Sequence, residues 1–494
     1  MIEIDQRVAV QPRSIASTPY DTAWVAAIPH PQERRDPRFP TALNWICQNQ
    51  WPDGSWGSAI PYLHDRVICT VAALIPLVRY GQRQTDYQQV IRGERYLWQN
   101  AQALENYPCE LVGFELLLPA LVDNAVTAGV KLPPYIRAFE KERERKLKML
   151  PEQMIYSNQV TVAHSLEFLG ATVDPIRLAG VQGANGSIGN SPAATAFFLH
   201  FLDDPEAVAY IERCLAADEG TAVSVLDPCE TFDDLWTAQH RWLGGEAALS
   251  ILSPELRQTL QVGLNGKGVS LSPSFPVPDA DETAVALVLF KDAGLDIEPT
   301  ALKEFERDDY FVSFQYERHP SVGVNIHALM ALLRYPQYPG QQAAIAKVIA
   351  FLGETRQQNS FWLDKWHISP HYATGRAVVA LLELDRTYPG RGQELLQPAL
   401  AWILETQNED GSWGYFGIPT VEETAYATLA LEHIQNPGLR IRTAIENGVG
   451  YIQAHLNEPR PAMWIDKCLY LPSRIVESAI YAALGRRAST NPTH

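Results

Sequence analysis

Two stretches far apart in the chain are nearly identical: residues 50–57 read Gln-Trp-Pro-Asp-Gly-Ser-Trp-Gly, and residues 407–414 read Gln-Asn-Glu-Asp-Gly-Ser-Trp-Gly. Partial copies of the same pattern begin at Gln182, Asn265 and Gln357. An Asp or Asn followed by Gly favours a tight turn. Because the turns also share neighbouring Gln, Ser and Trp residues, they indicate an internal structural repeat rather than unrelated loops.

The segments that follow these turns have the spacing of helices. Small and apolar residues recur at helical intervals in residues 191–202, 283–289 and 424–432. Strand-like alternation is scarce, and many of the 35 prolines lie in the connecting loops. We therefore predict an all-α protein of paired helices joined by Gly- and Pro-rich turns. Such repeats suit an α/α barrel, in which parallel inner helices surround a core.

The length of 494 residues allows two or three domains. One boundary is expected near 220–230, where a small, acidic segment is followed by Leu226-Asp227-Pro228-Cys229. A second lies in the Pro-rich and charged residues 28–40, which isolate a short first helix over residues 19–28.

Charge and cysteine content exclude some classes of function. The net charge of −17 argues against a general nucleic-acid or anionic-membrane binder, although it permits a local basic pocket. The six cysteines form no C-x-x-C pair, which is typical of reduced thiols in a cytosolic protein. The first residues lack the pattern of a signal peptide, and no apolar run is long enough to span a membrane. We expect a cytoplasmic protein.

Residues 278–284, Pro-Asp-Ala-Asp-Glu-Thr-Ala, carry three carboxylates just before an apolar helix. Acidic residues at a helix N-terminus can simply cap it and interact favourably with its dipole. A catalytic interpretation is more specific. Crowded carboxylates cannot all ionise, so one is held protonated, while the helix N-terminus makes that proton more acidic. A general acid that protonates a carbon-carbon double bond needs both properties.

The sequence resembles the class II diterpene cyclases, which start cyclisation by protonation. Asp279–Ala284 match the family motif D-x-D-D-T-A, with Glu282 in place of the last Asp. Other segments similar to the family follow in order along nearly the whole chain, at residues 17–26, 50–57, 64–68, 112–115, 185–196 and 410–426. The resemblance implies that Asp281 is the proton donor and Asp279 its supporting carboxyl. Glu282 keeps the charge but adds a methylene, which puts the tuning of acidity in doubt.

The resemblance also implies two α/α barrels, named γ and β, with the active site between them. Residues 1–30 would be the first helix of β, residues 31–225 the inserted γ barrel, and residues 226–494 the rest of β. The implied enzyme is an isomerase, an intramolecular lyase. It would convert geranylgeranyl diphosphate to a bicyclic labdane, halimane or clerodane (kolavenyl-type) diphosphate.

The diphosphate is expected to survive the reaction. A diphosphate-ionising terpene synthase uses D-D-x-x-D, and the acidic pairs at 203–204, 233–234 and 308–309 lack the third Asp. Two alternative substrates stay open: farnesyl diphosphate, giving a drimenyl product, and squalene, as in a squalene-hopene-like cyclase. An alternative of another class is an α/α-toroid binding or carbohydrate-processing protein. A downstream terpene synthase or phosphatase would consume the product.

Magnesium is expected to bridge the diphosphate, because a hard cation suits phosphate oxygens. Some family members bind it with E-D-x-x-D, but only the isolated acids Glu167 and Asp174 occupy that region, so the metal ligands stay unknown. Arg66, Lys467 and Arg474 are candidates for binding the diphosphate. Solvated surface charges are the alternative interpretation of these three residues.

A cyclising carbocation needs an apolar cavity that excludes water and offers aromatic faces. Candidate cavity residues lie mainly in a segment rich in aromatic and histidine residues that resembles the lining of this site in bacterial relatives: Phe275, Asn325, Trp366, His367, His371 and Tyr372. The two histidines and Asn325 are also candidates for positioning the final base or water. Ordinary barrel packing is the alternative for each.

Overall fold

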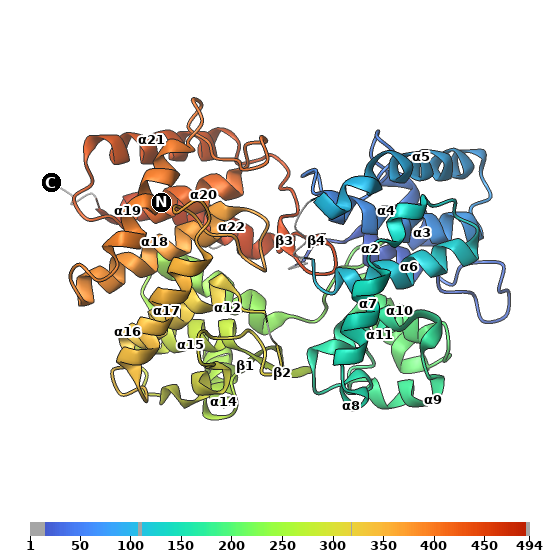
Figure 1. Cartoon of the computed structure of the whole chain (residues 1–494), viewed down its shortest axis with the longest axis horizontal. Helices are drawn as coiled ribbons and strands as arrows, with labels where there is room; N and C mark the ends of the chain where they lie inside the picture. Colours follow the sequence, from blue (N-terminus) through green and yellow to red (C-terminus); the bar gives the residue numbers. More distant parts are fainter. Residues whose placement is uncertain (1–14, 107–110, 318, 491–494) are drawn as a thin grey trace.

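The computed structural model describes residues 15–106, 111–317 and 319–490, and Figure 1 shows two helical lobes side by side. Within the described part, the strands form two short antiparallel hairpins, β1 (Val269–Ser272) with β2 (Phe275–Asp279) and β3 (Trp464–Ile465) with β4 (Leu469–Tyr470). The all-α prediction is confirmed. Residues 1–14 and Cys109 lie outside the described residues, and the other five cysteines are free thiols.

The first lobe is a closed ring of helices surrounded by outer helices. Its ring packs in the order α2, α4, α6, η3, α10 and back to α2. The bounds of the elements in this lobe are α2 Pro19–Ala26, α3 Pro40–Gln48, α4 Leu63–Tyr80, α5 Gln84–Asn100, η1 Ala101–Asn106, α6 Phe114–Ala128, η2 Pro134–Arg137, α7 Glu140–Met149, α8 Glu152–Ile155, η3 Thr161–Thr172, α9 Pro175–Leu178, η4 Ala179–Val181, α10 Pro192–Leu199 and α11 Pro205–Ala216.

The second lobe is also a closed ring, which packs in the order α12, α15, α16, α18, α20, α22 and back to α12. Helices α14, α17, α19 and α21 lie outside it, each against a ring helix. The bounds are α12 Glu230–Leu243, α13 Ala248–Ile251, α14 Pro254–Asn265, α15 Ala280–Asp292, η5 Pro299–Phe305, α16 Val322–Arg334, α17 Gln341–Thr355, α18 Pro370–Thr387, α19 Gln393–Glu405, α20 Val421–Glu432, α21 Leu439–Ala454 and α22 Ser473–Thr490. Each lobe is thus an α/α barrel.

The first helix packs differently from the prediction that assigned residues 1–30 to the second barrel. Helix α2 closes the ring of the first barrel, where Tyr20, Val25 and Ile28 are buried in the first hydrophobic core. Residues 20–26 are all buried among α3, α4 and α10, which accounts for this placement. The residues just before it reach the second barrel through the backbone bridge between Ile15 and Pro472. Later in the chain, the first core includes Val223 and the second begins at Val225.

The five repeated turns have one hydrogen bond in common. In each, a backbone N–H in the turn donates to a threonine hydroxyl in the following ring helix; the acceptors are Thr70, Thr195, Thr283, Thr374 and Thr424. In three turns a buried tryptophan also donates its indole N–H to a carbonyl of the preceding outer helix; they are Trp56, Trp362 and Trp413. The predicted repeat is therefore confirmed, and it supplies a common frame for comparing ring helices.

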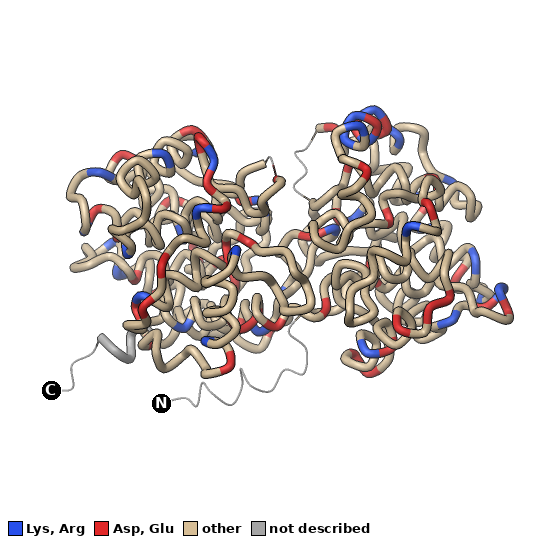
Figure 2. Tube along the Cα trace, turned by 90° about the horizontal axis from the view of Figure 1, so that it is seen from below, with Lys and Arg blue, Asp and Glu red and all other residues tan. Residues whose placement is uncertain are grey.

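No helix in the described ranges is long and apolar enough to cross a membrane. Figure 2 shows that basic and acidic residues are interspersed over both lobes and do not gather into one field of a single sign. Any site for an anionic group must therefore be a local arrangement of cationic side chains.

Hairpin β3–β4 joins the two barrels at a buried charged contact. Lys467, in the turn of this hairpin, lies 3.0 Å from Glu167 and 3.7 Å from Asp21 of the first barrel, and all three side chains are buried. The neighbouring Asp466 pairs with His164 of η3 at 3.1 Å. These ion pairs hold hairpin β3–β4 against the first barrel.

Candidate active site

The carboxylate cluster lies where strand β2 ends and ring helix α15 begins. Asp279 is the N-cap of α15, and its Oδ1 accepts hydrogen bonds from the backbone N–H groups of Asp281 (2.6 Å) and Glu282 (3.3 Å). Thr283 anchors the same turn through the repeated bond to Val269 N–H (2.9 Å). The local sequence therefore directs all three carboxyls into one chamber of the barrel.

Burial keeps protons on this cluster. Burial raises the pKa of Asp281 well above its usual range, with the charge of Asp364 adding to the effect and that of Arg376 opposing it. Burial and the charge of Asp279 likewise raise the pKa of Glu282. The pKa of Asp279 rises to about 6, again through burial, although its hydrogen bond with Glu282 opposes the shift. Asp281 is thus held in the protonated form that a general acid requires.

His327 on α16 contacts the acid directly. Its Nδ1 lies 2.6 Å from Asp281 Oδ1, and the ring lies against Trp236. Burial and the charge of Arg376 lower the pKa of His327 to about 3, so the imidazole is neutral. A neutral ring can donate its Nδ1–H to Oδ1, which leaves the acid proton on Oδ2. When that proton leaves, the same hydrogen bond stabilises the carboxylate and makes Asp281 a stronger acid.

Sequence reasoning missed His327. The signal available was one histidine in an otherwise apolar helix, directly after the repeat that carries the acid. A lone histidine in such a helix is usually a packed core residue, and only the folded ring of helices places it against Asp281.

We predict that His327→Phe lowers kcat by about 10- to 100-fold, because the departing proton leaves a carboxylate without its donor. Steady-state kinetics with the isoprenoid diphosphate substrate measure the effect. His371→Phe is the matched control, since it also replaces a buried ring-helix histidine but one that packs against Trp402. Equal kcat values for the two variants would contradict a role for His327 in tuning the acid.

Aromatic side chains form the walls of the chamber that holds the acid. Its volume is about 80 Å³, and its lining residues are Leu226, Phe232, Trp236, Leu271, Asp279, Asp281, Glu282, Phe314, Trp366, Tyr372, Trp464, Ile465, Asp466 and Tyr470. Aromatic faces attract positive charge without acting as nucleophiles. The chamber can therefore deliver a proton to an alkene and stabilise the cation that results.

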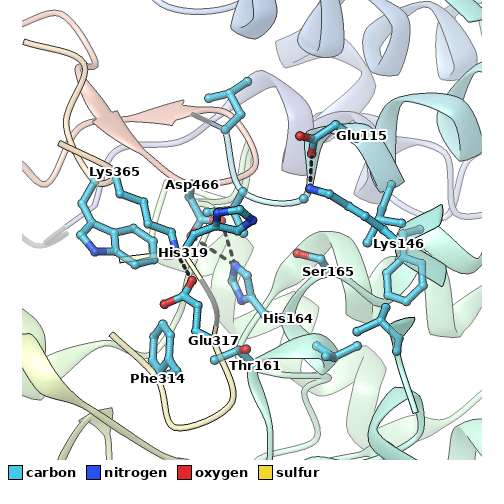
Figure 3. A pocket seen from close by; sticks show the side chains of 18 of the residues that line it. Glu115, Lys146, Thr161, His164, Ser165, Phe314, Glu317, His319, Lys365 and Asp466 are labelled. Carbon is cyan, nitrogen blue, oxygen red and sulfur yellow. Dashed lines mark hydrogen bonds and ion pairs between the residues drawn. The ribbon is translucent and has the colours of Figure 1, made fainter. Parts of the chain in front are cut away.

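A larger cavity of about 590 Å³ continues from this chamber and lies between the two barrels. The two share Leu226, Leu271, Phe314, Trp366 and Asp466 as lining residues. The mouth carries charged groups from both barrels, and Figure 3 shows three pairs around it: Glu115 with Lys146, Glu317 with Lys365, and Asp466 with His164. His319 also lines this cavity. One cavity thus combines a polar mouth with an apolar, acidic end.

The predicted cavity residues divide into two groups. Trp366 and Tyr372 line the acid chamber, and Phe275 and Trp366 line the larger cavity. Asn325, His367 and His371 line neither.

Each of these three side chains is fully buried among other groups. The amide of Asn325 binds the backbone of Phe311 and Ser321, while His367 binds Glu422 and His371 packs on Trp402. Their positions are those of packed barrel residues.

The three basic residues expected to bind the diphosphate lie away from the cavity. Arg66 bonds to Ser55 and lies over the ring of Trp51. Lys467 is the buried partner of Glu167, and Arg474 pairs with Asp233 at 2.7 Å. The basic side chains that line the larger cavity are instead Lys146, His164, His319 and Lys365. Burial alone would lower the pKa of His164, but the charge of Asp466 outweighs it and the pKa is raised.

The two acids in the region of the family's metal motif are used structurally. Glu167 accepts hydrogen bonds from Tyr20 and Lys467, and Asp174 caps helix α9. Neither lines the cavity. One carboxylate oxygen at the mouth, Glu317 Oε2, is buried and has no hydrogen-bond partner among the described residues.

Comparison with known proteins identifies the family. Residues 317–468 match the model of the squalene-hopene cyclase C-terminal domain. A type B diterpene cyclase of Mycobacterium tuberculosis is 33% identical over 493 residues, with 95% of each chain covered. The chain belongs to the class II diterpene cyclases. It is therefore an enzyme.

Further relatives agree with the two-barrel fold of this cyclase. The structure of an ent-copalyl diphosphate synthase from Streptomyces platensis superposes with a TM-score of 0.78 at 26% identity, covering 98% of the cyclase and 99% of that chain. An ent-copalyl diphosphate synthase of a Streptomyces species is 34% identical over 331 residues, which cover 65% of the cyclase and 62% of that relative. The prediction of two α/α barrels is confirmed.

Proposed function

We propose that this cyclase protonates the terminal double bond of geranylgeranyl diphosphate and closes two rings, while the diphosphate is retained. One observation carries the proposal: the protonated carboxyl of Asp281 lies in an aromatic chamber that continues into a larger cavity with a charged mouth. A linear prenyl chain would place its terminal alkene in the chamber and its diphosphate at the mouth. The chamber fits a hydrocarbon end, because most of its lining is apolar or aromatic.

The reaction begins and ends with a proton. The alkene π electrons take the proton from Asp281 Oδ2, and the resulting tertiary cation is attacked by the internal double bonds in turn. Hydride and methyl shifts then determine whether a labdane, halimane or clerodane skeleton forms. Loss of one proton restores neutrality in the hydrocarbon, so product and substrate are isomers and the enzyme is an intramolecular lyase. His327 holds the spent Asp281 carboxylate until it is protonated again.

The diphosphate binds to cationic side chains at the mouth. Lys146 and His164 come from the first barrel, and Lys365 and His319 from the second. A polyanion between the barrels would pair with basic groups on both sides and would compete for them with their present partners Glu115, Glu317 and Asp466. This arrangement answers how an acidic protein binds an anionic substrate.

Magnesium fits the mouth of the cavity. The ion prefers carboxylate and phosphate oxygens and commonly uses only one or two protein carboxylates. Glu317 offers a buried oxygen without a hydrogen-bond partner among the residues described, so we propose it as the protein ligand. Bound there, Mg²⁺ would neutralise part of the charge of the diphosphate. Because the product keeps this group, a downstream terpene synthase or phosphatase must remove it.

Incubation of the purified cyclase with geranylgeranyl diphosphate, farnesyl diphosphate or squalene tests the proposal. We expect an isomeric diphosphate from the C20 substrate, identified by mass spectrometry before dephosphorylation and by NMR after it. EDTA should lower the turnover, and added Mg²⁺ should restore it. Preferred conversion of farnesyl diphosphate or squalene would overturn the substrate assignment, and release of inorganic diphosphate would overturn its retention.

A further inference from the structure

Glu422 occupies on ring helix α20 the position that Asp281 occupies on α15. The repeated hydrogen bond fixes the comparison: Thr283 accepts from Val269 N–H, and Thr424 accepts from Trp413 N–H. Each carboxyl group lies two residues before its threonine, in the first turn of its helix. Both therefore face the interior of the same barrel. Glu422 is completely buried, and the mechanism above does not use it.

The hydrogen bonds around Glu422 are those of a carboxylate. Its Oε1 accepts from Trp464 Nε1–H (3.0 Å), His367 Nε2–H (3.0 Å) and the hydroxyl of Tyr426 (2.9 Å). The tautomer of His367 follows from its other nitrogen, Nδ1, which accepts from the backbone N–H of Ser369. Three donors on one oxygen favour the ionised form.

No arginine or lysine among the described residues pairs with this charge. Its contact with His367 is a hydrogen bond from Nε2–H, and Oε2 has no hydrogen-bond partner in the described part of the chain. A buried carboxylate without a full cationic partner is costly to stability. A buried negative charge can stabilise a positive charge that develops nearby. The proposed cyclisation generates such a charge in the acid chamber.

Glu422 is linked to the chamber by two aromatic side chains that line it. Trp464, which donates its indole N–H to Glu422, lines the chamber beside Asp281. Tyr372 also lines it and stacks on His367, with ring centroids 4.8 Å apart and planes 16° from parallel. A carboxylate that accepts an indole N–H increases the electron density of that ring, and the negative potential extends through the adjacent wall.

A buried charge of opposite sign lies behind other aromatic contacts. The Arg376 guanidinium lies 5.7 Å from the ring of Trp236 and 5.2 Å from that of Tyr372, and it donates to His240. Positive charge in the chamber is therefore repelled from the side of Trp236 and Tyr372, where Arg376 lies, and attracted to the Trp464 side. This gives the chamber a direction that its aromatic composition alone does not provide.

We propose that Glu422 is a positioning residue that makes the wall formed by Trp464 the negatively polarised side of the chamber, and so stabilises the carbocation during cyclisation. The inference rests on the proposed function, since it assigns a role only if a cation forms beside Asp281. It predicts that the charge of Glu422 affects how many hydride and methyl shifts the cation undergoes before a proton is lost.

Glu422→Gln tests the proposal, because it keeps a carbonyl acceptor for Trp464 and removes the charge. We expect kcat to fall on the order of tenfold with little change in KM, since the charge is separated from the cation by only one ring. The product mixture should shift toward skeletons that lose their proton earlier. Glu423→Gln is the matched control: Glu423 is equally buried, but it bonds to Ser369, Thr420 and the backbone of Tyr415 and not to the chamber aromatics.

The outcomes separate the inference from the proposed function. If wild-type enzyme gives no bicyclic product, the proposed function fails and the inference fails with it. If wild type is active and Glu422→Gln matches either wild type or Glu423→Gln in kcat and products, the inference alone is overturned. If Glu422→Gln does not fold, Trp464→Phe decides, because it keeps an aromatic ring in the wall but removes the N–H donor. A lower kcat at unchanged KM supports the proposal, and an unchanged kcat overturns it.

Discussion

Asp281→Asn is expected to lower kcat by more than about 10³-fold, because an amide cannot supply the proton that starts the reaction. Asn has nearly the shape of Asp, so the contact with His327 and the start of helix α15 should be retained. Burial raises the pKa of this carboxyl and so favours its protonated form, and we therefore expect the replacement to remove little buried charge. Product formation from the C20 substrate measures the loss, and circular dichroism checks that the helices remain.

Asp279→Asn is the comparison that isolates proton donation. Asn is a good N-cap and can still accept the two backbone hydrogen bonds of the first turn, so this variant should keep more activity than Asp281→Asn. A variant Asp281→Asn that turns over at a rate near that of the wild type would refute the assignment of the acid.

Lys467→Met is expected to lower the free energy of unfolding by about 3–5 kcal/mol, because it leaves buried carboxylates without their cation. Glu167 and Asp21 both lie within ion-pair distance of this lysine. The Met side chain fills a similar volume, so the loss reports the charge rather than a cavity. Urea denaturation monitored by tryptophan fluorescence measures the change.

Lys146→Met provides the contrast for this experiment. Lys146 is partly exposed at the mouth of the cavity, and its pair with Glu115 should contribute at most about 1 kcal/mol. We expect this variant to raise KM for the diphosphate substrate and to unfold much like the wild type. The reverse pattern, in which Lys467→Met raises KM without destabilising the protein, would restore Lys467 as a diphosphate ligand.

The parts of the site that were predictable depend on local sequence. The repeated turns fix where ring helices start, and Asp279 caps a helix with the residues that directly follow it. Burial of the carboxylates could also be anticipated, because they precede an apolar helix. For these features the interacting groups lie within a few residues of one another in the chain, so the sequence of one segment is enough to predict them.

The role of a basic residue could not be predicted in the same way, because it depends on distant partners. Lys467 and Arg474 are near family-like segments, but their partners Glu167 and Asp233 lie in helices of other regions. Each pair forms only after the barrels close. The basic groups at the cavity mouth were missed for the same reason, since Lys146 and Lys365 line one cavity from different barrels. The packing of the first helix was not predictable either, because a helix buried on all sides carries no periodic signal for its neighbours.

The hairpin between the barrels also constrains how the protein is made. Met463, Ile465, Cys468 and Leu469 belong to the hydrophobic core of the first barrel, although they are encoded near the end of the chain. On the ribosome, N-terminal domains usually fold before later ones are synthesised. Here the first barrel gains these core residues, and the lysine that pairs with its buried acids, only after residues 226–462 have been synthesised. Separately expressed halves would each lack part of one core, so coexpression is required to reconstitute the cyclase from fragments.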